Sequence, residues 1–398
     1  MSGRRRALVA GGGTAGHVLP ALAVARALEA HWGPGSVELV GSTRGMGPAL
    51  VEGAGVPVTL LPGRGFARRG GARAVAANVA AVAELGAALV AALWIVGRRR
   101  PAVVVSLGGY AAVPAGLAAA AWRVPLVVVN VDTVAGAANR VLARLARASA
   151  VAYPGTGLPR AVVTGAPVRA EVGAAARPDA ARRTAARRAL GLPEDGVVVA
   201  VFGGSLGARR LNEACLELAA RWSGRSDVAI YHVVGRRDAS WAAERARRLG
   251  LGGGSARYRQ VAYEERMARV YEAADVAVCR AGAMTVAELA VVGLPAVLVP
   301  LPGAPGDHQG RNAAVLEGAG AAVVLPDADC DGAGLAAALA PLVADPQQRV
   351  RMAQAAAAVG RPHAAEAVAV LCQAHARPGR RTARSACATS ATVPGSAT

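Results

Sequence analysis

The chain has 398 residues, of which 54% are hydrophobic but only 3% are aromatic. A chain of this length usually forms more than one core, so we expect two domains packed mainly from Ala, Val and Leu. The formal net charge is +19, and the basic residues are all arginines, spread over the whole chain. Such a charge could attract nucleic acid, but no zinc-finger or aromatic RNA-binding signature accompanies it, so nucleic acid is not expected as a partner. Attraction to anionic lipid headgroups fits it better.

Cysteine usage and the N-terminus predict a cytoplasmic protein. The five cysteines contain no C-x-x-C pair and are odd in number, which favours neither a disulfide framework nor a zinc site. The apolar run near the N-terminus is about four residues long, shorter than the core of a secretory signal peptide. It ends at Gly11.

The first half of the chain alternates strands and helices. An apolar strand at residues 7–10 runs into a glycine-rich turn, and residues 19–29 have the spacing of a helix. This alternation predicts a parallel sheet covered by helices on both faces. The further strands are expected at residues 37–40, 56–60, 103–106, 126–129 and 150–153, with a helix near 74–96.

The same pattern restarts after an arginine-rich stretch at residues 177–188. A β-branched run at residues 197–202 ends in Gly-Gly-Ser-Leu-Gly, and a helix is expected at 208–222. We therefore expect an α/β protein with two Rossmann-like domains, residues 1–165 and 166–376, and a ligand cleft between the carboxyl ends of their strands. Residues 377–398 lack periodicity and predict a disordered tail. Further strands are expected at residues 230–234, 276–279, 296–299 and 322–325.

The stretch at residues 79–97 is apolar enough to raise the question of a membrane span. Its only charge is Glu84, and it ends in three arginines. A transmembrane helix needs about 20 apolar residues. Because small residues dominate and a strand-like run follows at once, we expect a buried or membrane-touching helix, with a true span as the alternative.

The first glycine turn matches the dinucleotide fingerprint G-x-G-x-x-G at Gly11, Gly13 and Gly16. That fingerprint also needs an acidic residue at the tip of the second strand to bind a ribose. Here Glu38 lies inside the strand instead. An NAD- or FAD-dependent oxidoreductase is therefore disfavoured, and the turn is expected to present backbone N–H groups to a phosphate.

His17 opens the helix that follows this turn. At the mouth of a phosphate-binding turn it is placed to take a proton from a substrate hydroxyl, and the ordinary pKa of histidine suits that task. The alternative is a helix-start residue that only makes hydrogen bonds.

The second domain offers a matching set of polar groups. Ser205 lies in its glycine turn, and the segment at residues 280–288 opens another helix. Glu288 could accept hydrogen bonds from both hydroxyls of a ribose, or could be a solvated helix residue. Gln309 and Asn312 follow a Pro/Gly loop and could recognise sugar hydroxyls.

Neither a metal nor a redox cofactor is expected. Asp327, Asp329 and Asp331 imitate the start of a calcium loop, but the twelfth position is Ala338, where that loop needs Glu.

Six motifs in order resemble those of the MurG family, glycosyltransferase family 28. The resemblance implies the GT-B fold, two facing Rossmann-like domains, and inverting transfer of N-acetylglucosamine from UDP-GlcNAc to the muramyl 4-hydroxyl of lipid I, which yields lipid II in peptidoglycan synthesis. It also implies an undecaprenyl-linked acceptor and a peripheral place on the cytoplasmic face of the inner membrane. The motifs are GGGTAGH (11–17), GGY (108–110), TGAPVR (164–169), GGSLGAR (203–209), CRAGAMTVAE (279–288) and DHQ with NA (307–313).

The resemblance assigns roles to individual residues. The second domain would hold the donor, and the loops of the first domain would hold the acceptor, with His17 as the base. The implied donor contacts are Ser205 near the diphosphate, Ala283, Met284, Thr285, Val286 and Ala287 around the uridine, Glu288 on the ribose, Gln309 and Asp132 on the sugar, and Arg169 opposite the diphosphate charge; the implied acceptor contacts are Thr14, Ala15, Gly16, Gly108, Gly109 and Tyr110.

Two departures from the family pattern bear on the acceptor. Where the family has H-E-Q-N, this chain has V-N-V-D at residues 129–132, so an amide becomes the carboxylate of Asp132. Leu206 replaces the usual Gln of the second glycine turn. A MurG-like paralogue that glycosylates another lipid or a secondary metabolite is therefore an alternative, and a non-catalytic binding protein derived from the transferase is a third class.

A lipid acceptor requires contact with a membrane surface. The helix at residues 74–94, Trp122 and arginines at 68–69 and 98–100 could form an apolar patch ringed by cations. The alternative is that these residues are core and solubilising rim.

Overall fold

The computed structural model describes residues 6–12, 15–43, 55–63, 71–110, 112–204, 207–251 and 257–378. The predicted tail from residue 379 onward lies outside these residues. So do Thr14, Ser205, Leu206, Arg68 and Arg69.

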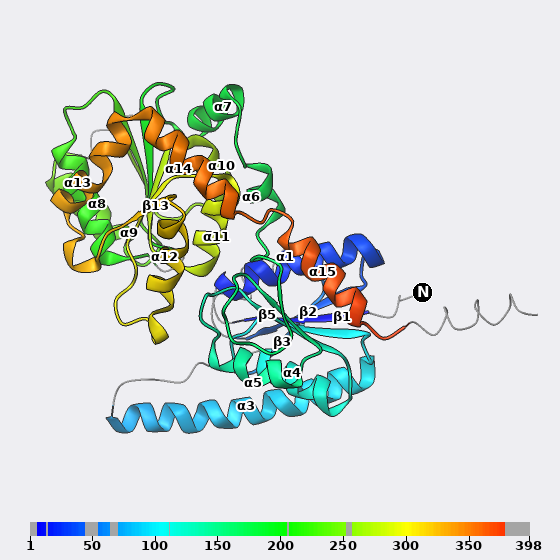
Figure 1. Ribbon diagram of the computed structural model, residues 1–398. Helices are drawn as coiled ribbons and strands as arrows, with labels where there is room; N and C mark the ends of the chain where they lie inside the picture. Colours follow the sequence, from blue (N-terminus) through cyan, green and yellow to red (C-terminus); the bar gives the residue numbers. More distant parts are fainter. Residues whose placement is uncertain are drawn as a thin grey trace, which may run out of the picture.

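The first domain is built on a seven-stranded parallel sheet with the order β3-β2-β1-β4-β5-β6-β7 (Figure 1). Strands β1, β4, β5 and β6 are buried along their whole length, as strands covered on both faces should be. The strands are β1 (Ala7–Ala10), β2 (Val37–Ser42), β3 (Val58–Leu61), β4 (Val103–Ser106), β5 (Leu126–Asn130), β6 (Ala148–Val151) and β7 (Ala161–Val163); the helices are α1 (Ala15–Trp32), α3 (Gly71–Arg99), α4 (Ala112–Ala121) and α5 (Ala137–Leu145).

The second domain repeats this topology with six parallel strands in the order β10-β9-β8-β11-β12-β13. The strands are β8 (Val197–Phe202), β9 (Val228–Val233), β10 (Tyr258–Val261), β11 (Val276–Cys279), β12 (Ala296–Leu298) and β13 (Ala322–Val324). Its helices are α6 (Ala170–Ala174), α7 (Ala180–Leu190), α8 (Arg209–Arg221), α9 (Ala239–Arg248), α10 (Met267–Ala273), α11 (Ala283–Val292), α12 (His308–Gly318), α13 (Gly332–Ala344) and α14 (Pro346–Val359), with short 3-10 turns at Pro305–Asp307 and Asp327–Asp329. The last helix of the chain is α15 (Ala364–His375).

Both sheets reverse their strand order at one place, between β1 and β4 in the first and between β8 and β11 in the second. Loops at the carboxyl ends diverge there, which is where open α/β sheets bind ligands. The predicted fold class, two Rossmann-like domains with parallel sheets, is confirmed.

Helix α15 differs from the predicted division of the chain. It falls within the predicted second domain, yet it packs against α1 and strands β4, β5 and β6 of the first. Val368, Ala369 and Cys372 join the core of the first domain, and the His31 ring contacts the Glu366 carboxylate. The apolar face of α15 covers the first sheet, so the chain crosses back after α14 (Figure 1).

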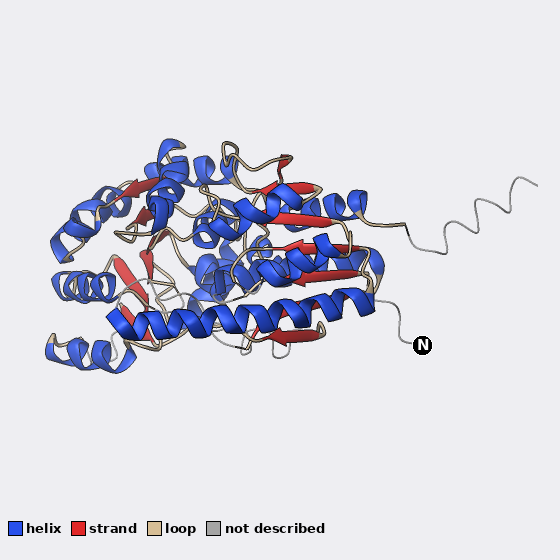
Figure 2. Ribbon diagram, turned by 90° about the horizontal axis from the view of Figure 1, so that it is seen from below, coloured by secondary structure: helices blue, strands red, loops and turns tan. Residues whose placement is uncertain are grey.

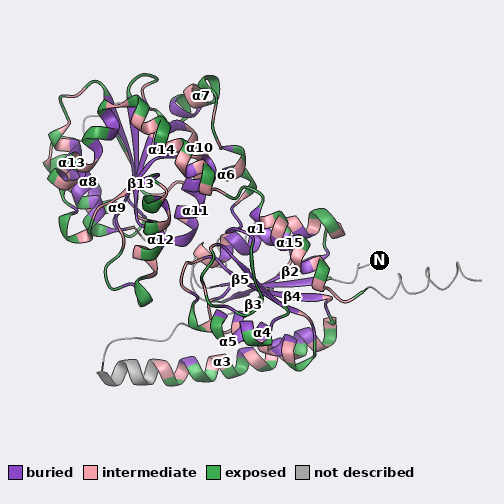
Figure 3. Ribbon diagram, viewed as in Figure 1, coloured by how far each residue is buried: buried purple, intermediate pink, exposed green. Residues whose placement is uncertain are grey.

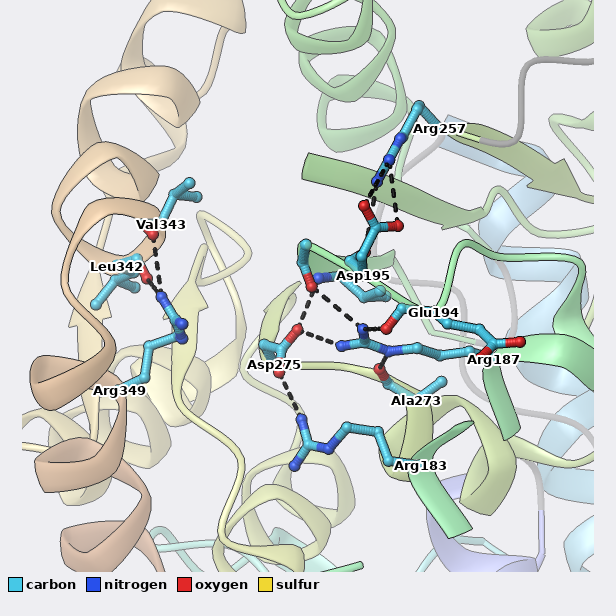
Figure 4. A network of polar contacts seen from close by, with 12 residues as sticks. Arg183, Arg187, Glu194, Asp195, Arg257, Ala273, Asp275, Leu342, Val343 and Arg349 are labelled. Atoms are coloured by element: carbon cyan, nitrogen blue, oxygen red, sulfur yellow. Dashed lines mark hydrogen bonds and ion pairs between the residues drawn. The ribbon is translucent and has the colours of Figure 1, made fainter. Parts of the chain in front are cut away.

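The arginine-rich stretch before β8 forms helix α7 and a network of charges. Arg187 is 4% exposed, and its Nη2 donates to Asp275 Oδ2 at 2.7 Å. The same carboxylate oxygen accepts from Val198 N, and the other accepts from Arg183 (Figure 4). This network fixes α7 to β8, the first strand of the second sheet in chain order.

Helix α3 lies along one face of the first domain, as Figure 2 shows. Ala88, Ala92, Ile95 and Val96 turn inward to a core shared with α4. Within the described part of the chain, α3 alone has the length and apolar composition that crossing a membrane requires, and 28% of its most apolar window is buried. One face of α3 is therefore packed on the domain, while the other is largely exposed (Figure 3).

Candidate functional site

Two glycine turns of the first domain, after β1 and β4, pack against each other. A Cβ on Gly109 would lie 2.4 Å from the Gly12 carbonyl oxygen, and its φ of +78° favours glycine. A Cβ on Gly11 would lie 2.9 Å from the His17 carbonyl oxygen. Only glycine allows this approach, so the turns bring residues 108–109 beside the start of α1.

His17 lies at this meeting point, in the first turn of α1. Its Nδ1 is buried and has no hydrogen-bond partner among the described residues. Burial disfavours the imidazolium and so lowers the pKa of His17. The Asp132 carboxylate and a backbone hydrogen bond with Leu107 raise this pKa, but by less than burial lowers it. The imidazole is therefore neutral at pH 7, the form that a general base needs.

Two further polar groups beside these glycine turns are buried without a described partner. Ser106 Oγ lies at the carboxyl end of β4, and Asn139 Oδ1 lies in the first turn of α5. The Asn139 amide donates to Val129 O and Asn130 Oδ1, and its Oδ1 lies 3.1 Å from where a Gly108 Cβ would be. The sequence analysis gave Asn139 no role.

Tyr110 lies at the edge of this region. Ser42 Oγ at the end of β2 donates to the Tyr110 hydroxyl at 3.1 Å, and the ring lies against the position of Gly63. Of the predicted acceptor contacts, Gly16, Gly108 and Gly109 thus lie around His17, while the Tyr110 hydroxyl points toward β2.

On the second domain, Glu288 is 7% exposed, so it is not a solvated helix residue. Tyr271 Oη donates to Glu288 Oε2 at 2.8 Å, and Arg169 Nη2 lies 3.6 Å from Oε1. Burial raises the pKa of Glu288, while Arg169 and the hydrogen bonds act against that rise. The structure thus brings together two of the predicted donor contacts, Glu288 and Arg169, and adds Tyr271, which sequence reasoning missed.

Helix α11, which carries Glu288, begins at the junction of the two domains. Its N-cap is Gly282, which supplies no side-chain hydrogen bond, so the first N–H groups of the helix have no side-chain cap. Ala283, Met284 and Ala287 pack in a cluster with Val18 of α1. Val286 turns into the second core, and Thr285 is partly exposed. The backbone of this turn and Thr285 are therefore the groups left for a ligand.

The remaining predicted sugar contacts divide between the domains. Gln309 is partly exposed, and its Oε1 accepts from Leu301 N at 2.9 Å. Asp132 follows β5, and its Oδ1 accepts from Asn312 Nδ2 at 3.0 Å. Asn312 is fully buried, so the prediction that it recognises sugar hydroxyls does not fit its position. The sequence placed Asn312 after a Pro/Gly loop but did not show that it would meet the first domain.

The described residues contain no group of three or more His, Cys, Asp or Glu side chains that could hold a metal ion. The acidic turn that imitates a calcium loop has other partners. Asp327 pairs with Arg280 at 2.6 Å, and Asp331 caps α13 through the N–H groups of Ala333 and Gly334. Glu38, the acidic residue of β2, is also buried and pairs with Thr59 and Arg99.

Two family models match the chain on either side of the junction. The glycosyltransferase family 28 N-terminal domain matches residues 7–151, and the C-terminal domain of the same family matches residues 198–368. The chain belongs to glycosyltransferase family 28. The assignments of the family and of the class of enzyme made from the sequence are confirmed.

Similar proteins agree over nearly the whole length. A Desulforudis audaxviator protein named UDP-N-acetylglucosamine--N-acetylmuramyl-(pentapeptide) pyrophosphoryl-undecaprenol N-acetylglucosamine transferase is 36% identical, covering 94% of this chain and all of its own. A Nocardioides protein of the same name is 40% identical over 89% of this chain and 93% of its own. The crystal structure of Acinetobacter baumannii MurG superposes with a TM-score of 0.69 at 29% identity, over 92% of this chain and 99% of that one.

Proposed function

We propose that this family 28 enzyme transfers N-acetylglucosamine from UDP-GlcNAc to the muramyl 4-hydroxyl of lipid I, forming lipid II. The proposal depends mainly on the contact between α1 and α11 at the junction of the two domains. A neutral histidine with a free ring nitrogen begins α1, and α1 packs against α11, which carries Glu288. The names of relatives that match 89–94% of this chain support the choice of substrates.

The second domain would hold the donor. The uncapped N–H groups of α11 and the positive end of the helix attract the diphosphate. Glu288 would accept hydrogen bonds from the ribose, and Tyr271 fixes the carboxylate for that purpose. Arg169 would offset the charge that grows on departing UDP, because a guanidinium stays protonated. UDP-GlcNAc is a substrate here, and no metal or redox cofactor takes part in the proposal.

The first domain would hold the acceptor and the base. His17 would remove the proton of the 4-hydroxyl as that oxygen attacks the anomeric carbon from the face opposite UDP. The bond between the anomeric carbon and the phosphate oxygen breaks, UDP leaves with the electron pair, and the proton stays on His17. One in-line displacement inverts the anomeric carbon without a covalent intermediate.

The outer face of α3 would bring the enzyme to the cytoplasmic surface of the membrane where an undecaprenyl-linked acceptor lies. Val79, Val90 and Trp94 are 66%, 69% and 64% exposed. Arg98 lies over the Trp94 ring at 5.6 Å, and Arg100 lies over the Trp122 ring at 4.7 Å. Apolar side chains with aromatic rings and cations at one end suit the boundary between headgroups and acyl chains.

The alternative is a paralogue with a different acceptor, which the V-N-V-D segment favours because Asp132 replaces an amide. The test is transfer of radiolabelled GlcNAc from UDP-GlcNAc to lipid I in vesicles by the full-length enzyme. Labelled lipid II is expected. Transfer to another lipid-linked or soluble acceptor, with none to lipid I, would select the paralogue. Thermal stabilisation by NADH and not by UDP-GlcNAc would refute both.

A further inference from the structure

One amide side chain spans the domain junction. Asn312 of α12 is fully buried, and its Oδ1 accepts from Thr133 N at 3.0 Å and from Thr133 Oγ1 at 2.9 Å. Its Nδ2 donates to Asp132 Oδ1 at 3.0 Å and, within its own domain, to Ala281 O at 3.4 Å. An amide has two donors and two acceptor sites, so Asn312 uses its whole capacity, and three of the four bonds cross between domains.

The apolar part of the junction cannot fix the orientation of the domains by itself. Met284 and Val291 of α11 share a core with Val18 and Leu22 of α1. Hydrophobic contact is non-directional and allows helices to slide, whereas hydrogen bonds need defined distances and angles. Asn312 therefore supplies the directional contact of the junction.

The residues that Asn312 holds are close to the proposed catalytic group. His17 precedes Val18, which packs in one cluster with Met284 of α11. The Asp132 carboxylate also acts electrostatically on His17, and Thr133 follows Asp132 in the chain. Gly306, in the loop before α12, also faces this segment, because a Cβ on it would lie 3.6 Å from Val134 Cγ1. Any rotation of the second domain away from the first would break the bonds of Asn312 and withdraw α11 from His17 together.

We propose that Asn312, Asp132 and Thr133 form an interdomain clasp that positions His17 against the donor site, so that efficient transfer requires the clasp to be closed. This inference rests on the proposed function for its link to transfer, but the clasp itself is a property of the enzyme without substrates. Asp132 and Asn312 would then act as positioning residues in addition to any contact of Asp132 with the donor sugar.

The decisive variant is Asn312→Asp, which places a second carboxylate against Asp132 at nearly unchanged volume. Like charges at this distance repel, and protonation of one carboxyl relieves the repulsion and restores a donor. The interdomain distance can be measured by pulsed electron paramagnetic resonance between spin labels at Val163 and Val350, which are 50% and 49% exposed. The described native cysteines are buried, and Cys387 is replaced by serine.

We expect Asn312→Asp to lengthen or broaden the distance at pH 8 and to recover toward the parent distribution as the pH falls. The double variant Asp132→Asn with Asn312→Asp exchanges donor and acceptor, so it should restore the parent distance at pH 8. Thr133→Ser keeps both bonds and serves as the matched control. If Asn312→Asp fails to fold, Thr133→Val, which removes only the hydroxyl, should still shift the distribution.

Measurements of kcat then test whether the clasp affects transfer. Asn312→Asp should lower kcat about 10- to 100-fold, since small misplacements of reacting groups cost that much, while UDP binding stays within about two-fold. An unchanged distance in Asn312→Asp, or a double variant that stays open, would overturn the clasp. These distances need no substrate, so absence of transfer to lipid I would refute the proposed function and leave this test standing.

Discussion

The two domains share one strand order but present different surfaces. In the described part of the chain, the large exposed hydrophobic side chains lie mostly in the first domain, including Val79, Val90 and Trp94 on α3, whereas the second shows Leu301 and Val350. Topology fixes where a ligand can bind, but it leaves the outer surface free to vary. This contrast supports the proposed function, in which the first domain contacts a lipid surface and the second holds the nucleotide sugar.

The two domains also differ in which buried polar atoms lack hydrogen-bond partners. In the first domain, the uncharged atoms His17 Nδ1, Ser106 Oγ, Asn139 Oδ1 and Thr156 Oγ1 lack described partners. In the second, the buried atoms without described partners are Arg169 Nε and Arg280 Nε, whose guanidinium groups are paired through other nitrogens. Glu288 is held there by Tyr271, and His232 lies between Asn212 and Tyr258. Unpaired buried groups cost stability, so those near His17 mark positions where a ligand can complete the hydrogen bonding.

The largest expected effect tests the first domain. His17→Ala should lower turnover about 10²- to 10⁴-fold because it removes the general base, with UDP binding by calorimetry little changed. The parent enzyme should lose activity only as pH falls through the lowered pKa of His17, below its ordinary value of 6.5, where the imidazole becomes protonated. Normal turnover in the variant would make His17 a structural helix-start residue.

The surface difference is tested by charge on α3. Val90→Glu with Trp94→Glu should weaken binding to anionic vesicles about 100-fold, because each exposed apolar side chain contributes about 1.5 kcal/mol or more on burial. Leu301→Glu with Val350→Glu in the second domain is the matched control, since it adds the same charge and both side chains are about half exposed. Equal loss in both variants would mean that net charge, and not the α3 face, governs binding.

Donor recognition is tested by Tyr271→Phe. Loss of the hydrogen bond to Glu288 should raise the Kd for UDP about 10-fold, because bonds to charged groups contribute about 1.5 kcal/mol or more. Tyr258→Phe removes a hydroxyl that bonds to His232 in the same domain and should leave UDP binding unchanged. Similar Kd values for both variants would show that Glu288 takes no part in ribose recognition.

The smallest effect concerns stability. Burial lowers the pKa of His232 to about 3, against an ordinary 6.5 in the unfolded chain. Between these values the unfolded state binds a proton that the folded state does not, so the free energy of unfolding should fall by up to about 1.4 kcal/mol per pH unit below pH 6.5. His232→Gln should flatten that slope in urea unfolding at pH 7 and pH 5. A slope as steep as the parent's would assign the acid sensitivity to other groups.

Much of the sheet was predictable because buried parallel strands are nearly continuous apolar runs. Strands β1, β4, β8 and β11 begin and end where the sequence predicts. Strand β10 was missed because its Tyr-Arg-Gln-Val sequence is half polar, and it lies at the sheet edge, where only one neighbour constrains it. Glycine turns were also predictable, since a missing Cβ is a local requirement.

The sequence by itself determined the parallel α/β architecture, the two glycine turns and the family, because these depend on local periodicity and on residue types at short spacing. Only the tertiary structure decided that α15 returns to the first domain, that Glu288 is buried against Tyr271, and that Asn312 crosses the junction to Asp132. Those contacts join residues distant in the chain. Their partners are chosen by how the two sheets pack, which no local pattern records.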